Sequence, residues 1–343
     1  MKKKLSIVDI AKHLNVSTTT VSFILNGRAK EKRISNELVE KVLKFVEEVG
    51  YKPNFLARGL RTGKSNIIGL MVEDIANPFF ANIARQIEEN ANRNGYKILY
   101  SSTDNELEKA KELIEIFRER HVDGYIIAPP DGLDDDVNSL IKSGTPVVLF
   151  DRFLQGVETD CVGIDGEESI YNAVNHLVER GYRKIGFVTL DSLQSQMQDR
   201  LHGYERAINE HGLADYVKEI SYYQSPENKV KQIISFLKRK NDLDAVVFAT
   251  NYLGVSGLKA ISALGLKVPE DIALFAFDEL DLFELYSPSI STVAQPVKEI
   301  AENVISILID RLNQSPASKP DAYKRIQLPT SLIVRDSSAA KVD

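Results

Sequence analysis

Two stretches share the pattern that decides the fold of this 343-residue chain: HVDGYII at residues 121–127 and DLDAVVF at residues 242–248. Each leads from a helical pattern through a short turn into an apolar strand. Around them, apolar runs of strand length alternate with helical patterns from residue 66 onward. Apolar strands without polar alternation are typical of parallel sheets that helices cover on both faces. We therefore predict an α/β core of two similar halves, each with a doubly wound parallel sheet.

The alternation also places the individual elements. The predicted strands are 67–72, 97–101, 124–128, 147–150, 185–190, 219–223, 245–249 and 272–277. The predicted helices are 80–94, 106–120, 133–143, 169–179, 201–211, 230–240 and 253–264. Because ligands of open parallel sheets bind at the carboxyl ends of the strands, two facing halves would enclose a cleft.

The composition is that of an ordinary globular protein, with 43% hydrophobic and 27% charged residues. The single cysteine, Cys161, excludes an intramolecular disulfide, and we expect a reducing, cytoplasmic location. No export signal is expected, since Asp9 interrupts the first apolar run. No apolar stretch approaches the ~20 residues of a membrane helix, so no membrane span is predicted.

Charge is distributed unevenly along the chain. Residues 1–64 contain 14 Lys and Arg against 6 Asp and Glu, a net charge of +8. The remaining residues contain 29 against 43, a net charge of −14. A basic segment of this kind indicates a polyanionic partner, with the phosphate backbone of a nucleic acid first and an anionic membrane surface second. A solvated basic face without a partner is the third interpretation.

The first fifty residues predict three short helices. Ser6 can open the first one with a capping box to Asp9. Ser17 and Ser35 can cap the second and third, and Gly27 follows the end of the second. Two helices joined by a tight turn and braced by a third are the outline of a helix-turn-helix module.

A further short helix is predicted over residues 55–62, after Pro53 and with Asn54 as its cap. Eight residues are too few to be stably helical alone, because nucleation of a helix is costly. We expect this linker to become ordered only against a partner.

Nothing in the sequence supports catalysis or metal binding. Gly59 and Gly63 are separated by three residues, whereas the phosphate-binding Walker loop has four. The five histidines show no metal-ligand spacing, and no G-x-S-x-G nucleophile motif occurs. We therefore predict no enzymatic activity, no catalytic residues, no cofactor and no metal site.

The second predicted helix begins with STTTVS at residues 17–22. Three consecutive threonines are indifferent helix formers, so propensity does not explain them. Short hydroxyl side chains can instead meet phosphates and base edges while Val16 and Val21 face the core. An exposed polar helix without a partner is the alternative, and the basic charge of the segment argues against it.

Several fragments occur together in order: IVDIA (7–11), VSTTTVS (16–22), LNG (25–27), GYxPNxxARxL (50–60) and NPFF (77–80). Later fragments are RxxGY (200–204), FD (277–278) and STVxQP (291–296). Over nearly the whole chain, this combination resembles the LacI/GalR (lac repressor) family of bacterial transcription regulators.

The resemblance implies how the N-terminal part binds double-stranded DNA. Thr18 and Thr19 would read bases from a recognition helix in the major groove, and Phe23 could contact a thymine methyl. Leu60 of the hinge helix would wedge a base step apart in the minor groove. The implied DNA-binding residues are Ser17, Thr18, Thr19, Ser22, Phe23, Asn26, Asn54, Ala57, Arg58 and Leu60.

The resemblance also divides the chain. It implies an all-α helix-turn-helix headpiece (1–50), a hinge-helix linker (51–64) and an α/β core like that of periplasmic binding proteins. The N-terminal core subdomain would span 65–163 with 293–322, and the C-terminal one 164–290 with 326–336. The implied effector-binding residues are Phe79, Phe80, Asp151, Arg152, Arg200, Asn251 and Asp278. A plain surface ion pair is the alternative interpretation of Asp151 and Arg152.

The function implied is that of a cytoplasmic, homodimeric transcription repressor on a near-palindromic operator. A small molecule, expected to be a sugar or sugar derivative, would act through order and disorder of the hinge helix. The alternative is a cytosolic sugar-binding or sugar-processing protein without a DNA role. That alternative accounts for the core but leaves residues 1–64 without a purpose.

Overall fold

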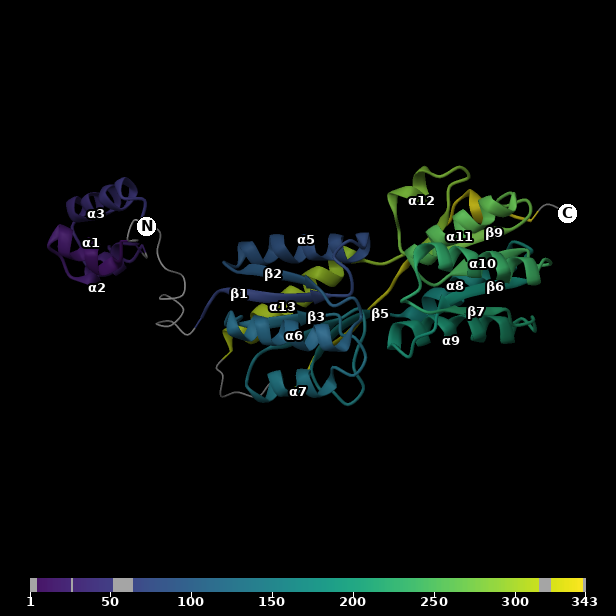
Figure 1. Ribbon diagram of the computed structural model, residues 1–343, viewed down its shortest axis with the longest axis horizontal. Helices are drawn as coiled ribbons and strands as arrows, with labels where there is room; N and C mark the ends of the chain where they lie inside the picture. The colour runs from purple at the N-terminus through teal and green to yellow at the C-terminus, as the bar shows by residue number, and fades with distance from the viewer. Residues whose placement is uncertain (1–4, 26, 52–63, 315–321, 342–343) are drawn as a thin grey trace. The chain divides into compact units, whose positions relative to one another are not determined.

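A computed structural model describes residues 5–25, 27–51, 64–314 and 322–341. The chain forms two compact units, residues 1–65 and 66–343, which we call the head and the core unit (Figure 1). The hinge helix predicted over 55–62 lies outside the described residues. The predicted DNA contacts that also lie outside them are Asn26, Asn54, Ala57, Arg58 and Leu60.

The described part of the head contains the three expected helices, α1 (Ile7–Leu14), α2 (Thr18–Leu25) and α3 (Asn36–Glu48). The Ser6 hydroxyl accepts a hydrogen bond from the Asp9 N–H, and the Asp9 carboxylate accepts one from the Ser6 N–H, which confirms the predicted capping box. Ser35 caps α3 by accepting from the Leu38 N–H. Between α1 and α2, Asn15 turns the chain in the left-handed region, with φ of 52°.

The first sheet of the core unit is entirely parallel. Its strand order is β11-β5-β4-β3-β1-β2. The strands are β1 (Ile67–Val72), β2 (Lys97–Ser102), β3 (Gly124–Ile127), β4 (Val147–Phe150), β5 (Asp160–Ile164) and β11 (Arg325–Leu328). Helices α5 (Pro78–Arg93) and α13 (Val297–Asn313) pack on the face of Ile68 and Leu70. Helices α6 (Leu107–Glu119) and α7 (Asp134–Lys142) pack on the face of Met71. We call this layered body the N-terminal lobe.

The second sheet has the order β12-β10-β9-β8-β6-β7, with β12 antiparallel to β10 at one edge. Its strands are β6 (Ile185–Leu190), β7 (Val217–Ile220), β8 (Ala245–Phe248), β9 (Ala273–Phe277), β10 (Ser291–Ala294) and β12 (Ser331–Ile333). Helices α8 (Gly166–Glu179) and α9 (Ser195–Glu210) cover the face of Phe187. Helices α10 (Pro226–Arg239) and α11 (Asn251–Leu264) cover the face of Val188. With the short α12 (Asp281–Leu285) and a 3-10 turn (Asp336–Ser338), this is the C-terminal lobe.

The chain crosses between the lobes after β5, after β10 and after β11, which corrects three predicted boundaries. Ile164 belongs to the N-terminal lobe, because it is the last residue of β5. Residues 293–294 belong to the C-terminal lobe, because β10 pairs with β9 through Val293. Residues 326–328 belong to the N-terminal lobe, because β11 pairs with β5. Strand β11 pairs with a strand that lies about 160 residues earlier in the chain, and no local pattern in a four-residue strand identifies such a partner.

Most predicted elements lie within a few residues of the observed ones. The largest differences are at the starts of α9, which begins six residues before the predicted residue 201, and of α10, which begins four residues before the predicted residue 230. Strand β7 lies at Val217–Ile220 rather than at 219–223. The first turn of α9 contains polar residues at buried positions, such as Gln196, and so lacks the apolar stripe that the prediction used.

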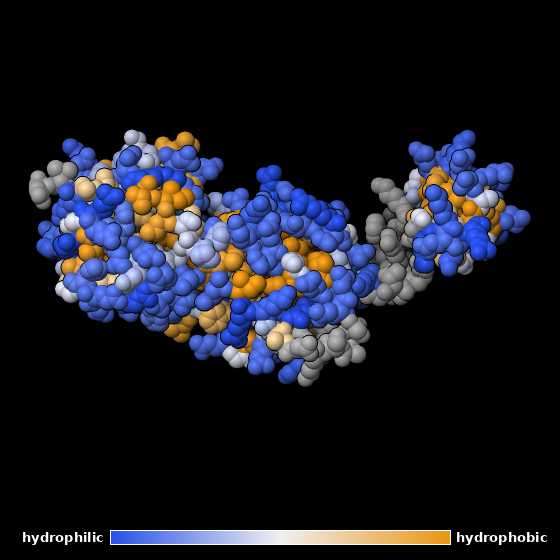
Figure 2. Space-filling model, turned by 180° about the vertical axis from the view of Figure 1, so that it is seen from behind, coloured by the Kyte–Doolittle hydropathy of each residue, from blue (hydrophilic) through white to orange (hydrophobic). Residues whose placement is uncertain are grey.

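The surface of the core unit is mostly hydrophilic on the face drawn in Figure 2, with apolar areas on both lobes. Two large apolar side chains are far more exposed than the rest of their class: Leu193 at 86% and Leu285 at 81%. Isolated exposed leucines are common, but Leu285 shares the short helix α12 with the half-exposed Leu282.

Helices α8 and α9 approach so closely at Gly203 that a Cβ there would lie 2.1 Å from the Glu167 carbonyl oxygen. Gly203→Ala should therefore lower the free energy of unfolding by about 1–3 kcal/mol, because the backbone must move to admit the methyl group. Denaturant unfolding measures the change. The control is Gly163→Ala on β5, where a Cβ meets nothing within 4 Å and a change within about 0.5 kcal/mol is expected. Equal effects of the two substitutions would contradict the close approach.

Candidate functional site

A cleft lies between the lobes at the carboxyl ends of strands from both sheets. This position is that of a small-molecule site in an α/β protein. The lining residues of the N-terminal lobe are Glu73, Asn77, Phe79, Phe80, Asp151 and Arg152. Those of the C-terminal lobe are Leu190, Gln194, Gln196, Met197, Arg200, Thr250, Tyr252 and Asp278, and Gln295 comes from the crossing after β10.

Arg152 is held on three sides in the N-terminal lobe. Its Nη2 donates to Glu73 Oε2 at 2.9 Å, its Nε donates to Asp151 Oδ2 at 2.9 Å, and its Nη1 donates to Asn105 Oδ1 at 2.9 Å. The side chain is only 4% exposed, so the interpretation of Asp151 and Arg152 as a surface ion pair is wrong. Burial alone would lower the pKa of Arg152, but the two adjacent carboxylates outweigh it and raise that pKa.

Asp151 and Asp278 occupy equivalent positions in the two lobes. Each follows a phenylalanine that ends a strand, β4 or β9, and each has a left-handed backbone, with φ of 66° and 67°. Few residues other than glycine adopt that region, and it turns both aspartates out of the strand direction at the cleft. Asp278 accepts a hydrogen bond from Gln295 Nε2 at 2.7 Å. Burial raises the pKa of Asp278, and the nearby Arg200 opposes that rise.

Arg200 comes from α9 and is 3% exposed. Its guanidinium carbon lies 3.6 Å from the centroid of the Phe277 ring, and Nη1 donates to the Ala249 carbonyl at 2.6 Å. Burial lowers the pKa of Arg200, while Asp278 opposes the decrease. Arg200 Nε and Gln196 Oε1 are both buried and have no hydrogen-bond partner among the described residues. A buried donor and a buried acceptor left unpaired beside a cleft are places where a ligand can bind.

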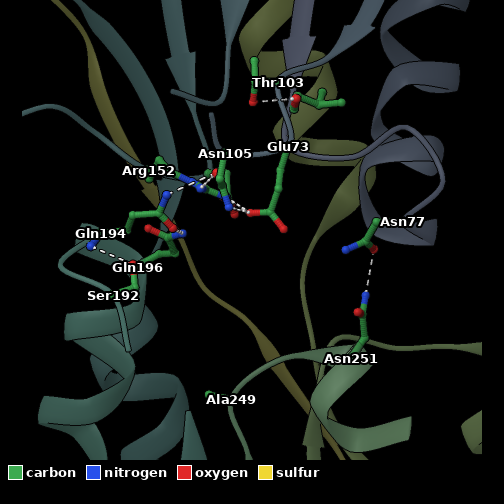
Figure 3. A network of polar contacts seen from close by, with 12 residues as sticks. Glu73, Asn77, Thr103, Asn105, Arg152, Ser192, Gln194, Gln196, Ala249 and Asn251 are labelled. Atoms are coloured by element: carbon green, nitrogen blue, oxygen red, sulfur yellow. Dashed lines mark hydrogen bonds and ion pairs between the residues drawn. The ribbon is translucent and has the colours of Figure 1, made fainter. Parts of the chain in front are cut away.

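Polar side chains also link the lobes directly (Figure 3). Gln194 Nε2 donates to Asn105 Oδ1 at 3.2 Å, and Asn251 Nδ2 donates to Asn77 Oδ1 at 2.9 Å. The Tyr223 hydroxyl donates to the Asn105 carbonyl at 3.0 Å. The two lobes are therefore held together around the cleft by hydrogen bonds between neutral groups.

The structure gathers six of the seven predicted effector-binding residues at this cleft. Phe79 and Phe80 form an edge-to-face pair with centroids 5.0 Å apart, and Asp151, Arg152, Arg200 and Asp278 provide charge. Asn251 does not line the cleft; it holds Asn77, which does.

Residue-by-residue reasoning missed Glu73, which could have been found. It directly follows the predicted strand 67–72, and the carboxyl end of a strand is where ligands of parallel sheets bind. Asn105, Tyr252 and Gln295 had no comparable signal. Their roles depend on contacts with residues far away in the sequence.

The head presents the predicted recognition helix α2 with its threonines outward. Thr18 and Thr19 are exposed, while Val21 and Ile24 are buried in the core of the head. The Ser17 hydroxyl accepts from the Thr20 N–H at 2.9 Å, so it caps α2 as expected.

Phe23 is half-buried and lies under two cations of the following loop. Lys32 Nζ is 5.3 Å and Arg28 Cζ is 5.9 Å from its ring centroid. This ring is therefore a platform for basic side chains as well as a candidate base contact.

The residues that the structure describes contain neither a membrane-spanning helix nor a metal-binding cluster. No helix among them is long and apolar enough to cross a membrane. No group of three or more His, Cys, Asp or Glu side chains in the described ranges is arranged to hold a metal ion. Burial raises the pKa of Cys161 to about 12, which makes its thiol a poor nucleophile at neutral pH.

Comparison with known proteins adds family information to this geometry. Residues 6–54 match the family described as bacterial regulatory proteins, lacI family, and residues 174–338 match a periplasmic binding protein-like domain. The chain is 30% identical to the HTH-type transcriptional repressor PurR of Aliivibrio salmonicida over 312 residues, 90% of this chain and 92% of that protein.

Two solved structures are also similar. A LacI family transcriptional regulator from Enterococcus faecium with bound ribose has a TM-score of 0.70 at 26% identity, covering 80% of this chain and 99% of that one. A lac repressor dimer bound to operator and the anti-inducer ONPF has a TM-score of 0.85 at 22% identity, covering 98% and 100%; at that identity the likeness concerns the fold.

Arg152→Ala should lower the free energy of unfolding by about 3–5 kcal/mol, because it leaves Glu73 and Asp151 buried next to each other without a cation. The control is Arg118→Ala, which breaks an exposed pair with Glu115 on α6 and should cost less than about 1 kcal/mol. Denaturant unfolding compares the two variants. A loss for Arg152→Ala no larger than for the control would mean that the buried pair is not a structural requirement.

Proposed function

We propose a function on the premise that this chain belongs to the lacI family of bacterial regulatory proteins. It is a transcription repressor, and a polyhydroxylated small molecule in the cleft between the lobes controls it. The head binds operator DNA in a sequence-specific manner. Its net charge of +8 attracts the phosphate backbone. The core unit carries the ligand site. This division of labour explains why the two parts of the chain have opposite net charge.

The observation that carries the ligand proposal is the unpaired buried polar set at the cleft. Arg200 Nε is a donor without a partner, and Gln196 Oε1 is an acceptor without one. Asp278, Gln194 and the amide of Asn77 add further acceptors and donors around the same space. Sugar hydroxyls both donate and accept, so they match such a set, and the similar regulator from Enterococcus faecium is described with bound ribose.

Control of DNA binding follows if the ligand changes the arrangement of the two lobes. A ligand that contacts both lobes shifts the equilibrium toward the arrangement it binds better. We infer that this shift reaches the head through the linker, whose predicted helix over 55–62 lies outside the described residues.

We also propose that the protein acts as a homodimer on a near-palindromic operator in the cytoplasm. The similar lac repressor structure contains a dimer bound to operator. Two-fold symmetry of a protein is mirrored in the symmetry of its DNA site. The exposed Leu285 and Leu282 of α12 offer an apolar contact of the kind that a second copy could cover.

The alternative of a sugar-binding or sugar-processing protein without a DNA role is not favoured. It leaves the match of residues 6–54 to a family of DNA-binding regulators unexplained. The family consists of regulators, and we propose no enzymatic activity for this chain.

For the head, we propose that Thr18, Thr19 and Phe23 face base edges and that Ser17 and Ser22 approach phosphates. The contacts proposed for Asn26, Asn54, Ala57, Arg58 and Leu60 complete the set. Support comes from the exposure of Thr18 and Thr19 on α2 and from the basic loop beside Phe23.

Thr19→Ala should weaken binding to the operator by roughly 5- to 30-fold, about 1–2 kcal/mol, because one base contact is lost. Binding to a scrambled duplex should change less than about twofold, since phosphate contacts remain. Fluorescence anisotropy at one fixed salt concentration measures both, with an operator selected from random duplexes by the wild-type protein. Thr145→Ala, the same substitution in the core unit, is the control. An equal loss on both duplexes would exclude base reading by Thr19.

Arg200→Ala should abolish the effect of the ligand on operator affinity and leave the affinity without ligand within about threefold of wild type. The ligand probes are unphosphorylated pentoses and hexoses, beginning with ribose, and ligand-induced rises in melting temperature identify those that bind. The control is Arg206→Ala on the same helix, which removes an exposed pair with Glu167 and Glu168. A variant without Arg200 that still responds to ligand would contradict the site.

A further inference from the structure

We propose that the cleft excludes negatively charged ligands and that Glu73 is the residue that excludes them. The inference rests on the proposed function, because it names the class of ligand for the same site. The class is an uncharged polyol, such as an unphosphorylated aldose, or its amino derivative. Sugar phosphates and sugar acids are the excluded classes.

The Glu73 carboxylate is placed where it can meet a ligand. Glu73 directly follows β1 and is 5% exposed, so its charge lies in the wall of the cleft rather than in bulk solvent. Its Oε2 accepts both from Arg152 Nη2 at 2.9 Å and from Asn105 Nδ2 at 2.8 Å. In Figure 3 the other carboxylate oxygen points away from these donors, on the side of Asn77. One carboxylate oxygen is thus available to a ligand, and it can only accept.

The charge of Arg152 is already balanced inside the cleft wall, because Arg152 contacts two carboxylates, those of Glu73 and Asp151, within 2.9 Å. Arg200 is stacked on Phe277 and donates to the Ala249 carbonyl. The lining residues contain three carboxylates and two guanidinium groups, so the cleft carries more negative than positive charge. A phosphate on the side of Glu73 would therefore meet a carboxylate and a cation that two carboxylates already neutralise.

Lys229 does not change this balance. Its ammonium group donates to the Tyr222 carbonyl at 2.6 Å and lies 5.4 Å from the ring centroids of Tyr222 and Tyr252. It is not a lining residue of the cleft. Of these three side chains, Tyr252 lines the cleft.

The physical consequence is a large difference between a hydroxyl and a phosphate in the same place. A ligand hydroxyl or ammonium donates to the available oxygen of Glu73 and strengthens the complex. A phosphate at neutral pH cannot donate there, and two like charges side by side in a partly closed cleft repel each other strongly. We expect a phosphate ester to bind at least about 100-fold more weakly than its parent sugar.

The first experiment uses the full chain and matched pairs of ligands. Isothermal titration compares ribose with ribose 5-phosphate and glucose with glucose 6-phosphate and with glucosamine. Binding only by members without negative charge is expected. A phosphate ester that binds as tightly as its parent sugar would overturn the inference.

The second experiment uses inorganic phosphate as the probe, so it works whether or not any sugar binds. Wild-type protein should show no phosphate binding in the cleft, whereas Glu73→Gln should gain at least about tenfold in phosphate affinity, because the amide N–H₂ replaces the available oxygen. Glu73→Asp keeps the charge and should keep phosphate out. Glu112→Gln removes the same charge from an exposed position on α6 and is the matched control. Phosphate binding by the basic head is common to all four proteins and cancels in the comparison.

The outcomes distinguish a failure of the charge exclusion by Glu73 from a failure of the proposed sugar effector. If phosphate gains affinity only in Glu73→Gln but no sugar of the panel binds, the inference about charge stands and the proposed sugar effector is wrong. If sugars bind but wild type and Glu73→Gln take phosphate equally, the effector site stands and the role of Glu73 is wrong. The wild-type measurements alone decide the exclusion of anions, even if Glu73→Gln does not fold.

Discussion

Arg152 carries a positive charge into a place that is nearly closed to bulk water, and the loops around it are arranged to compensate that charge. The loss of hydration is tolerated only because strong partners replace the water. Those partners come from the end of β1, from the loop after β2 and from the end of β4. The buried guanidinium of Arg152 thus connects the ends of three strands into one wall of the cleft. The same pairing sets the charge that an incoming ligand meets.

The C-terminal lobe also has a phenylalanine, an aspartate and a buried arginine beside the cleft. Phe277 and Asp278 stand at the end of β9 as Phe150 and Asp151 stand at the end of β4, and both aspartates have a left-handed backbone. The second arginine, however, comes from α9 and keeps one unpaired N–H, whereas Arg152 uses its donors inside its own lobe. The guanidinium donors of the N-terminal wall are therefore already used, which leaves one carboxylate oxygen of Glu73 there, whereas the C-terminal wall has an unpaired donor and an unpaired acceptor. A ligand is expected to be oriented mainly by the C-terminal lobe.

Most strands and helices could be predicted because their apolar residues recur at regular spacing. The errors occur where that spacing is absent. Strand β6 was placed at its observed bounds because all six residues are apolar or small and are flanked by turns. Helix α9 was predicted too short because polar residues are buried at its start, Gln196 in the first turn and Arg200 in the second, where they line the cleft. Asp151 and Arg152 were found through family resemblance, not through spacing. Glu73 and Asn105, 32 residues apart, become a pair only when β1 and β2 lie side by side.

Reversible control requires that the contacts between the lobes be neither too weak nor too strong. The bonds from Gln194 to Asn105 and from Asn251 to Asn77 join neutral groups, and each such bond contributes only about 0.5–1.5 kcal/mol. A ligand at a hundred times its dissociation constant supplies about 2.7 kcal/mol, which is on the same scale as a few of these bonds. Had an ion pair such as that of Arg152 and Glu73 spanned the lobes instead, breaking it would cost more than a small metabolite can return. The strong pair lies within one lobe and the weak bonds lie between lobes, and that distribution lets ligand binding decide how the lobes are arranged.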